Sequence, residues 1–589
     1  MDIIDVLSQA GTLPELFRER VRLSPDATAY RFFDALNGVW SNLSWRHMAQ
    51  QVARWQAALR REGLIAGDAV SIMARNSQHW VAFDQAALSL GLVVVPLFAN
   101  DRADNARYIL ESARVRLLLI EGESQWQELA GRLDDLPELN SIVSITTLDG
   151  DRQAGVVLLH DWLPASADEN SALPALNPDD LATLIFTSGT TGLPKGVMLS
   201  HRNILSNVRA GLESVPISAT DSFLSFLPLS HALERTVGYY LAMMAGATVA
   251  HARGVQELAE DLLAVRPTCL ISVPRIYERV YARICEGLQE KSALSSRLFK
   301  LAVDVGWQRF EHRQGRTGPR PGMLLWPLLE KLVAGKVTAR LGGRLRIAIS
   351  GGAPLSPEIA RVFTGLGVPV LQGYGLTEFS PVVSVNRVDR NIPTSIGLAL
   401  PGVEVKIGDD DELLVRGDSV MQGYWQNPEA TSAAIDAEGW LHTGDRARID
   451  NDFIFIIGRL KDIIVLANGE KVPPGDIELA ITEDILFDQV MVVGESSPFL
   501  SALVVLNQKQ WQRVRPRSGG TQAEEKFVLA RIAKCLLGFP GYAVIRRATL
   551  LEEPWTLENE LLTPTLKVKR QQVAALYADA IASMYNGHD

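Results

Sequence analysis

Short apolar runs alternate with helical patterns along most of the chain. Runs at 181–187, 269–273, 345–349 and 368–371 have the length of buried strands, and each ends in a cluster of Gly, Ser or Pro. Strands that alternate with helices predict layered α/β structure. Because ligands of α/β sheets tend to bind at the carboxyl ends of strands, these clusters are the first candidates for a site.

The most apolar stretch covers residues 86–98. It is too short to cross a bilayer, and Asp84 and Pro96 lie near its two ends. It therefore predicts a buried helix that runs into a buried strand.

The pattern changes near residue 403. Short strands at 403–407, 412–416 and 453–457 have little helix between them, and a compact α+β segment of domain size follows Gly458. The predicted fold class is α/β. A large N-terminal domain of layered α/β subdomains (1–458) includes a small β-rich subdomain (about 395–458), and a separate α+β domain (462–589) ends the chain.

Composition limits the class of protein. The chain has 589 residues, of which 47% are hydrophobic and 21% charged, as in a globular protein with a large core. The net charge of −10 argues against a surface built for nucleic acid. Three cysteines without CxxC spacing argue against disulfides and structural zinc, and two acids in the first five residues argue against a secretory signal. We expect a cytoplasmic protein.

One stretch is basic within this acidic chain. Residues 291–340 hold ten Lys and Arg against three acids, with Trp and Leu side chains interleaved. A helical hairpin with a solvated basic face explains this pattern. Peripheral contact with anionic lipid on the inner membrane surface is the alternative, and a contact between two copies of the chain is a third.

A loop rich in Gly and hydroxyl residues follows the first predicted strand. It reads Thr187-Ser188-Gly189-Thr190-Thr191-Gly192-Leu193-Pro194-Lys195-Gly196. Such a loop can present backbone N–H groups, hydroxyls and one cation to a polyphosphate. It is not a Walker A loop, because Pro194 stands directly before the lysine.

This loop resembles the phosphate-binding loop of adenylate-forming enzymes, the superfamily of acyl-CoA synthetases, peptide-synthetase adenylation domains and beetle luciferases. Further motifs resemble that family in order and spacing across nearly the whole chain. In the family, the segment at 350–354 lines the adenine, which implies this role for Gly352, Ala353 and Pro354.

The next motif reads Gln372-Gly373-Tyr374-Gly375-Leu376-Thr377-Glu378. Tyr374 offers a π face to the purine, and Gln372 could read an adenine edge. Thr377 can bond a phosphate oxygen. Glu378 is a hard carboxylate of the kind that binds Mg²⁺ together with substrate phosphates.

The later motifs complete the set that the resemblance implies. Asp445 accepts hydrogen bonds from the ribose hydroxyls, and Arg459 contacts the ribose–phosphate side. Residues 459–461 form a hinge, with Lys461 at the position that the family fills with Asp or Lys. The C-terminal domain is then a mobile lid, and Gly469 and Lys471 face the coenzyme A side.

The family's essential lysine aligns with Lys567. Leu566 stands where many relatives have a small residue, so Lys569 stays an alternative. The implied reaction uses ATP and Mg²⁺ to turn a carboxylate into acyl-AMP and pyrophosphate, with Lys567 between the carboxylate and the α-phosphate. Coenzyme A then takes the acyl group, after rotation of the C-terminal domain removes the lysine.

The motif at 227–235, Leu-Pro-Leu-Ser-His-Ala-Leu-Glu-Arg, resembles the acyl-CoA synthetase form beside the substrate pocket. Relatives that activate amino acids place an Asp near His231 to pair the substrate ammonium, so an amino acid is disfavoured. His231 is predicted to gate the pocket, with a structural histidine as the alternative. This motif, residues 273–279, the insertion after them and residues 469–474 resemble the long-chain fatty acid–CoA ligase branch.

Other readings stay open at this point. Medium-chain or aromatic acids could be the substrates. An acyl-AMP ligase that loads a carrier protein would carry an insertion near the hinge, and none stands between Asp445 and Gly458. A non-catalytic binding protein on the same fold would be expected to lack Glu378 or Lys567, and both are present.

Overall fold

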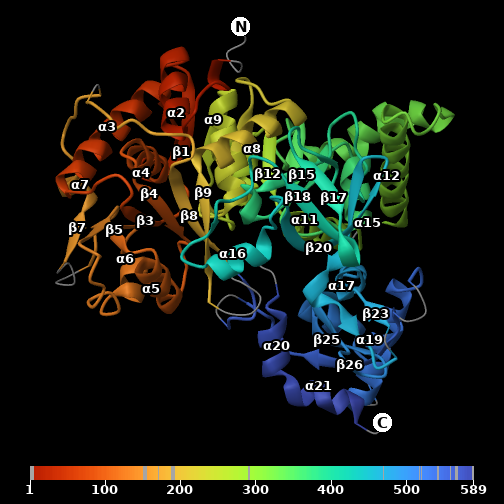
Figure 1. Ribbon diagram of the computed structural model, residues 1–589. Coiled ribbons are helices and arrows are strands. Elements are labelled where there is room, and N and C mark those ends of the chain that lie inside the picture. Colours follow the sequence, from red (N-terminus) through yellow and green to blue (C-terminus); the bar gives the residue numbers. More distant parts are fainter. Residues whose placement is uncertain are drawn as a thin grey trace.

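The computed structural model describes residues 6–149, 155–169, 171–187, 193–289, 292–468, 470–516, 518, 520–539, 543–556, 559–563 and 568–586. Two large sheets and their helices form the chain up to about residue 460, and a smaller α+β unit follows, drawn in blue in Figure 1. The predicted α/β fold class is confirmed.

The first sheet has eight strands in the order β19-β9-β8-β4-β3-β5-β6-β7. The strands from β8 to β7 are parallel, and β9 and β19 add antiparallel edges. They are β3 (Ala69–Met73), β4 (Val93–Leu97), β5 (Val115–Ile120), β6 (Ser141–Ser144), β7 (Val156–Leu158), β8 (Leu181–Thr187), β9 (Lys195–Ser200) and β19 (Gly423–Tyr424). The accompanying helices are α2 (Leu13–Leu23), α3 (Trp45–Arg61), α4 (Gln78–Ser89), α5 (Ala103–Ser112), α6 (Glu123–Leu129) and α7 (Leu159–Trp162).

The apolar stretch at 86–98 forms the end of α4 and all of β4. Every residue of β4 and the last ten residues of α4 are buried. The prediction of a buried helix that runs into a buried strand is therefore confirmed.

The second sheet has thirteen strands in the order β17-β18-β20-β21-β16-β15-β14-β13-β12-β10-β11-β1-β2. The run from β14 to β1 is parallel, and β14 pairs with β15 in the antiparallel sense. The strands are β1 (Thr28–Asp34), β2 (Val39–Ser44), β10 (Ser222–Ser225), β11 (Thr248–His251), β12 (Cys269–Ser272), β13 (Ile347–Ser350), β14 (Val370–Gly375), β15 (Val382–Val385), β16 (Leu398–Ala399), β17 (Glu404–Ile407), β18 (Glu412–Arg416), β20 (Leu441–Asp450) and β21 (Phe453–Arg459).

The strands of the β-rich part of the chain thus belong to the same sheet as the parallel strands, and β14 joins the two groups. We predicted a strand that ends at residue 371, before the glycines, but β14 continues to Gly375. A Cβ at Gly375 would lie 2.0 Å from the Pro381 carbonyl oxygen, so a glycine is needed where the two strands meet. Gly373 and Gly375, which we interpreted as the end of the strand, pair with residues of β15.

Three helices lie between the two sheets, two of them buried throughout. They are α8 (His201–Ser214), the π-helix η2 (Glu234–Leu241) and α9 (Ala242–Ala245), and every residue of η2 and α9 is buried. One hydrophobic core runs from β3, β4 and β9 through these helices to β10, β12 and β13. A helix that is buried on all sides is expected at the centre of a large domain.

A buried ion pair fastens η2 to the first sheet. Asp84 on α4 accepts from the Arg235 guanidinium, and both side chains are almost fully buried. Arg235 also donates to the Thr183 hydroxyl on β8 at 2.7 Å, and the Tyr240 hydroxyl donates to Asp84 at 2.7 Å. The charges are therefore paired and surrounded by hydrogen bonds, which is the condition under which a buried pair is tolerated.

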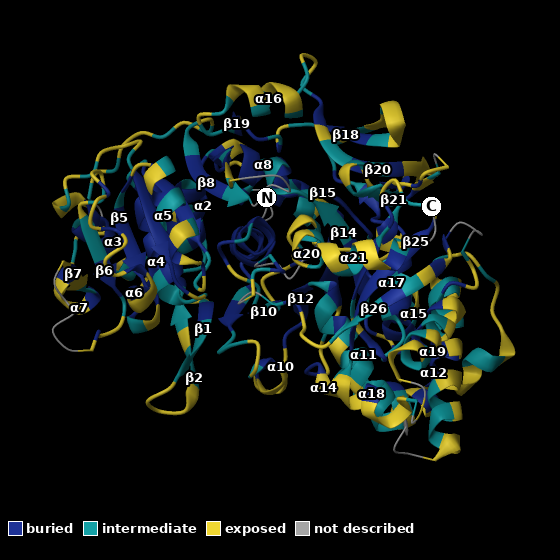
Figure 2. Ribbon diagram, turned by 90° about the horizontal axis from the view of Figure 1, so that it is seen from below, coloured by how far each residue is buried: buried dark blue, intermediate teal, exposed yellow. Residues whose placement is uncertain are grey.

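Within the basic stretch, residues 293–313 and 321–340 are helical, and α12 packs on α15, a helix that covers the second sheet. The helices of this region are α10 (Leu258–Val265), α11 (Pro274–Gln289), α12 (Ala293–Arg313), η3 (Pro321–Leu325), α13 (Trp326–Leu329), η4 (Glu330–Ala334), α14 (Gly335–Arg340) and α15 (Pro357–Gly365). A Cβ at Gly306 would lie 1.7 Å from the Gly365 carbonyl oxygen, so α12 and α15 approach through glycines. Exposed residues recur along α12 and α14 (Figure 2).

The C-terminal unit has cores of its own, formed by residues from Ile464 onward. Its elements are β22 (Ile464–Val465), β23 (Lys471–Val472), α17 (Pro474–Thr482), β24 (Phe487–Val493), β25 (Leu500–Leu506), α18 (Gln508–Val514), α19 (Gly520–Cys535), β26 (Ile545–Leu551), α20 (Arg570–Leu576) and α21 (Ala578–Tyr585). The short helices η5 (Thr377–Phe379), η6 (Asp409–Asp411), α16 (Pro428–Ala434) and η7 (Leu460–Asp462) precede it. Within the described ranges, no helix is both long enough and apolar enough to cross a membrane.

Replacing Asp84 with Ala should destabilise the protein strongly. Arg235 would keep its charge in a buried place without a counter-ion, which typically costs about 3–5 kcal/mol. Urea unfolding of the variant should show a clear fall in midpoint. Asp26→Ala removes the exposed partner of Arg46 and should leave the midpoint nearly unchanged. Equal midpoints for the two variants would contradict the role of the buried pair.

Candidate active site

The phosphate loop begins where β8 ends. Thr187 pairs with Lys195 across β8 and β9, which brings the two ends of the loop together. Ser188, Gly189, Thr190, Thr191 and Gly192 lie outside the described residues. The loop's lysine is therefore anchored on a strand at the carboxyl end of β8, as expected for a phosphate site.

Tyr424 on β19 joins the phosphate loop to the predicted metal ligand. The ammonium of Lys195 lies 5.1 Å from the centre of the Tyr424 ring. The Tyr424 hydroxyl donates to Oε1 of Glu378 at 2.8 Å. Burial, with Glu378 adding to it, raises the pKa of Tyr424, so the hydroxyl stays protonated and keeps donating. Sequence reasoning missed this residue, because an isolated Gly-Tyr pair carries no motif.

Glu378 suits a magnesium site that is completed by phosphate oxygens. Its carboxylate is half-buried in η5, directly after Thr377 and the end of β14. Among the described residues, no group of three or more His, Cys, Asp or Glu could hold a metal. Mg²⁺ commonly binds one or two carboxylates together with substrate phosphates, so a single Glu beside a phosphate loop fits.

The predicted purine and ribose residues lie in contact. The Tyr374 hydroxyl donates to Oδ2 of Asp445 at 2.5 Å, and the Arg459 guanidinium donates to Oδ1 at 3.0 Å. Asp445 and Arg459 face each other across β20 and β21. Burial and the neighbouring Asp445 raise the pKa of Tyr374 well above its usual range, so its hydroxyl remains a donor.

Gln372 has a different position from the one we predicted. Its side-chain oxygen accepts from the Leu355 backbone N–H at 2.8 Å, and its amide donates to the carbonyls of Pro393 and Ser395, each at 3.1 Å. These bonds occupy the amide, so it is not available to read an adenine edge. It instead holds the end of the segment that contains Gly352, Ala353 and Pro354, which are exposed.

The glycines around Tyr374 are backbone positions in the sheet. Gly373 and Gly375 pair with Val385 and Val382 of β15.

His231 follows β10 and is half-buried. Its Nδ1 accepts from the Leu233 N–H at 3.2 Å, so the ring is oriented by the start of the helical segment.

The C-terminal motif approaches the same side of the molecule. Lys567 and Gly469 lie outside the described residues. On one side of Lys567, Glu560 forms an ion pair with Arg102. On the other side, Lys569 lies close enough to the buried Asp101 to oppose the rise that burial causes in the pKa of that carboxyl. Residues 101 and 102 follow β4, which neighbours β8, so both flanks lie near the phosphate loop.

Of the residues predicted for the hinge and for the coenzyme A side, Lys461 and Lys471 are described, and both are exposed. Lys461 lies in η7, the short helix that begins directly after Arg459. Lys471 is exposed, and its ammonium lies 3.9 Å from Oδ1 of Asp410 on the larger domain. These two lysines therefore lie where the two parts of the chain meet.

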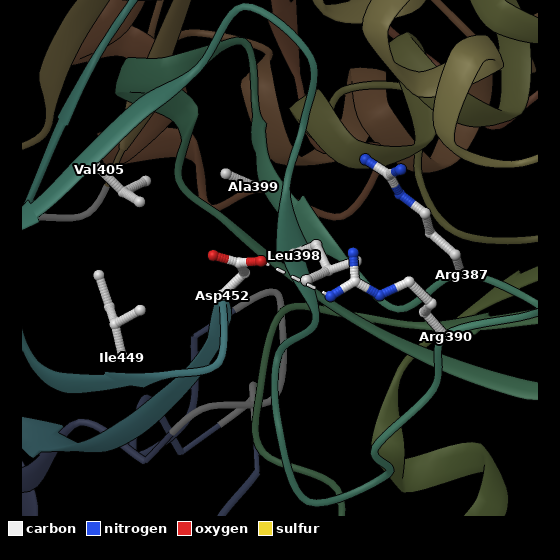
Figure 3. A pocket seen from close by; sticks show the side chains of 7 residues that line it. All are labelled: Arg387, Arg390, Leu398, Ala399, Val405, Ile449 and Asp452. Carbon is white, nitrogen blue, oxygen red and sulfur yellow. Dashed lines mark ion pairs between the residues drawn. The ribbon is translucent and has the colours of Figure 1, made fainter. Parts of the chain in front are cut away.

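A pocket of about 380 Å³ lies away from these residues, near the turn between β20 and β21. In Figure 3, Arg390 points toward Asp452 across it, and the two are 3.7 Å apart. The five residue steps from Asp445 to Asp450 span about 17 Å of strand, so this pocket is separate from the predicted ribose site. None of the residues predicted for the nucleotide or the acid lines it.

Comparisons with known proteins identify the family of the chain. The AMP-binding enzyme model matches residues 17–425, and the AMP-binding enzyme C-terminal domain model matches residues 461–589. The chain is 32% identical over 595 residues to the long-chain-fatty-acid–CoA ligase FadD15 of Mycobacterium bovis, covering 96% of each chain. It is 32% identical over 569 residues to the peroxisomal long chain acyl-CoA synthetase 6 of Arabidopsis thaliana, covering 90% of this chain and 79% of that one.

The fold resembles a solved structure of the anthranilate CoA ligase AuaEII in complex with anthranoyl-AMP. The TM-score is 0.76 at 19% identity, and the match covers 97% of this chain and 98% of that one. The family models span most of the chain, and the residues that contact one another are those of the family's motifs. The chain therefore belongs to the AMP-binding enzyme family, the adenylate-forming superfamily.

Proposed function

We propose that the protein is a long-chain fatty acid–CoA ligase that forms acyl-AMP from ATP and then acyl-CoA. The observation that carries this proposal is the set of contacts made by Lys195, Tyr374, Glu378, Asp445 and Arg459, which come from β9, β14, η5, β20 and β21. The relatives named as long-chain ligases, similar over nearly the full chain, support the choice of acid and acceptor.

In the first half-reaction, a carboxylate oxygen attacks the α-phosphorus and pyrophosphate leaves. The protein contributes positioning and charge stabilisation more than covalent chemistry. Tyr374 and Asp445 hold the nucleoside, Thr377 bonds a phosphate oxygen, and Lys195 faces the departing pyrophosphate. When bound at Glu378, Mg²⁺ supplies further charge neutralisation of the phosphate oxygens.

Lys567 acts in the first half-reaction only, the formation of acyl-AMP. It would approach the carboxylate and the α-phosphate from the C-terminal domain. The ion pair of Glu560 with Arg102 and the electrostatic effect of Lys569 on Asp101 support this orientation. They also give Lys569 an electrostatic partner of its own, which favours Lys567 as the lysine that acts on substrate.

In the second half-reaction, the coenzyme A thiol attacks the acyl carbonyl and AMP leaves. The contacts between the two domains include several polar pairs: Ser356 with Glu483, Glu286 with Lys509, and Asp410 with Lys471. The Glu286–Lys509 and Asp410–Lys471 pairs are largely exposed, and pairs of this kind contribute little free energy. Rotation about Lys461 is therefore compatible with them, and it would bring Gly469 and Lys471 toward the thiol.

We also propose that the region 291–340 contacts anionic membrane. Exposed leucines lie among its Lys and Arg residues: Leu294 (73% exposed), Leu301 (42%), Leu324 (85%), Leu325 (48%), Leu328 (57%) and Leu332 (41%). Clustered basic residues attract an anionic surface, and apolar side chains beside them can enter the headgroup boundary. A homodimer through the same surface is the competing arrangement.

The purified protein should release pyrophosphate from ATP and Mg²⁺ when a long-chain fatty acid is present. Addition of coenzyme A should convert the adenylate to acyl-CoA. A ladder of acids, with medium-chain and aromatic members, checks the chain length by kcat/KM. Adenylate that coenzyme A does not discharge would indicate a carrier protein as acceptor. No pyrophosphate with any acid would contradict an enzymatic function.

Lys567→Ala should lower the rate of adenylate formation by roughly 10²–10³-fold, the effect typical of losing one transition-state donor. Thioester formation from supplied acyl-AMP should be retained, because the lysine is not needed for that step. Lys569→Ala is the matched control and should leave both rates near those of the wild type. Loss of adenylation in Lys569→Ala instead would assign the role to the other lysine.

The protein should sediment with vesicles that contain anionic lipid, less so at high salt, because screening weakens surface attraction. Replacement of Leu324 and Leu328 with Ser should reduce binding. Leu36→Ser changes a leucine that is 98% exposed elsewhere and should have no effect. Absence of binding, or a dimer that only the first variant disrupts in ultracentrifugation, would refute the membrane contact.

A further inference from the structure

The crossing segment, residues 421–425, joins the phosphate-loop strand to the predicted metal ligand. Its strand β19 pairs with β9 in the antiparallel sense, and two backbone N–H groups beside β19 donate to carbonyls of β9 at 3.0 and 2.7 Å. At the start of the segment, the Met421 N–H donates to the Glu378 carbonyl at 2.9 Å. The backbone of Glu378 is thereby fixed relative to β9, the strand that begins at Lys195.

The backbone that carries Tyr424 is also held from outside β9. The Tyr424 N–H donates to the Thr431 hydroxyl on α16 at 2.9 Å. The next residue, Trp425, donates from its indole N–H to the Ser112 carbonyl at the end of α5 at 3.0 Å. A Cβ at Gly423 would lie 2.8 Å from the Thr431 side chain, and φ at Gly423 is +137°, so a glycine is needed directly before the tyrosine.

The two ends of the Tyr424 side chain contact different groups of the candidate site. The ring lies beside the exposed ammonium of Lys195, 5.1 Å from the ring centre. The hydroxyl donates to Oε1 of Glu378 at 2.8 Å. An ionised carboxylate has about four acceptor positions on its two oxygens, so this bond still allows a metal to bind at Glu378. One side chain therefore contacts both the cation and the carboxylate that serve the phosphates in the proposed reaction.

A hydrogen bond to a metal-binding carboxylate orients the carboxylate. Loss of such an outer partner typically costs about 10- to 100-fold in metal affinity. Glu378 is the one protein ligand that we predict for Mg²⁺, and its half-buried side chain has several rotamers of similar energy. The bond from the Tyr424 hydroxyl selects one of these rotamers.

We propose that Tyr424 is a positioning residue for the metal and for the pyrophosphate end of ATP. Its hydroxyl holds the Glu378 carboxylate in the orientation that binds Mg²⁺, and its ring holds the Lys195 ammonium beside the same phosphates. This inference rests on the proposed function, in which Glu378 and Lys195 serve ATP. Loss of the hydroxyl should therefore weaken the binding of ATP only when Mg²⁺ is present.

The test measures the affinity of the full chain for ATP by titration calorimetry, without fatty acid, once with Mg²⁺ and once with EDTA. No adenylate forms without the acid, so binding is measured independently of activity. In the wild type, Mg²⁺ should increase the affinity. Tyr424→Phe removes the hydroxyl and keeps the ring, so the affinity with Mg²⁺ should fall by about tenfold while the affinity in EDTA stays within about twofold of the wild type.

Two further variants control this comparison. Tyr585→Phe removes a tyrosine hydroxyl that donates to the Val493 carbonyl at 3.1 Å in the C-terminal domain, and it should change neither affinity. Tyr424→Leu removes the ring as well, so Lys195 loses its aromatic partner, and the affinity in EDTA should also fall, by about threefold. If this variant does not fold, Tyr424→Phe still decides the question.

A double-mutant cycle separates positioning from general structural support. Glu378→Gln alone should lower the affinity for ATP with Mg²⁺. Addition of Tyr424→Phe should then cause no further loss, because the hydroxyl acts through that carboxylate. A general defect of the fold would instead add to the first loss.

Three results would overturn the proposal. They are an unchanged affinity with Mg²⁺ in folded Tyr424→Phe, a fully additive loss in the double variant, and a wild-type affinity for ATP that does not depend on Mg²⁺. Failure of the ligase proposal would look different, because the wild-type protein would then release no pyrophosphate with any acid.

Discussion

The paired charges of Asp84 and Arg235 are the constraint on which the architecture depends. A guanidinium inside a protein must be neutralised and hydrogen-bonded, and the partners of Arg235 come from α4, β8 and η2. They can all be satisfied only when η2 packs against α4 and β8. The same helix contacts β10 and β12 of the second sheet. One ion pair thus fixes the position of a helix that both sheets share.

Two tyrosines then connect residues that we propose for the nucleotide site. Tyr424 is on a two-residue strand that crosses to the first sheet, and it links Lys195 to Glu378. Tyr374 is at the end of β14 and bonds to Asp445. In both cases a hydroxyl with a raised pKa donates to a carboxylate. The residues proposed for phosphate, metal, purine and ribose are therefore oriented by direct contacts within the protein itself.

The sequence predicted most of what local pattern can encode. Apolar runs predicted the first and last residues of β8 and β18 correctly. Motif residues such as Tyr374, Asp445 and Arg459 are in contact in the structure. Local pattern could not predict which side chains contact each other when they are far apart in the sequence. Gln372 has the same identity whether it reads a base or bonds to Leu355, and nothing near Tyr424 marks it. Asp84 and Arg235 are 151 positions apart, so only the fold reveals them as partners.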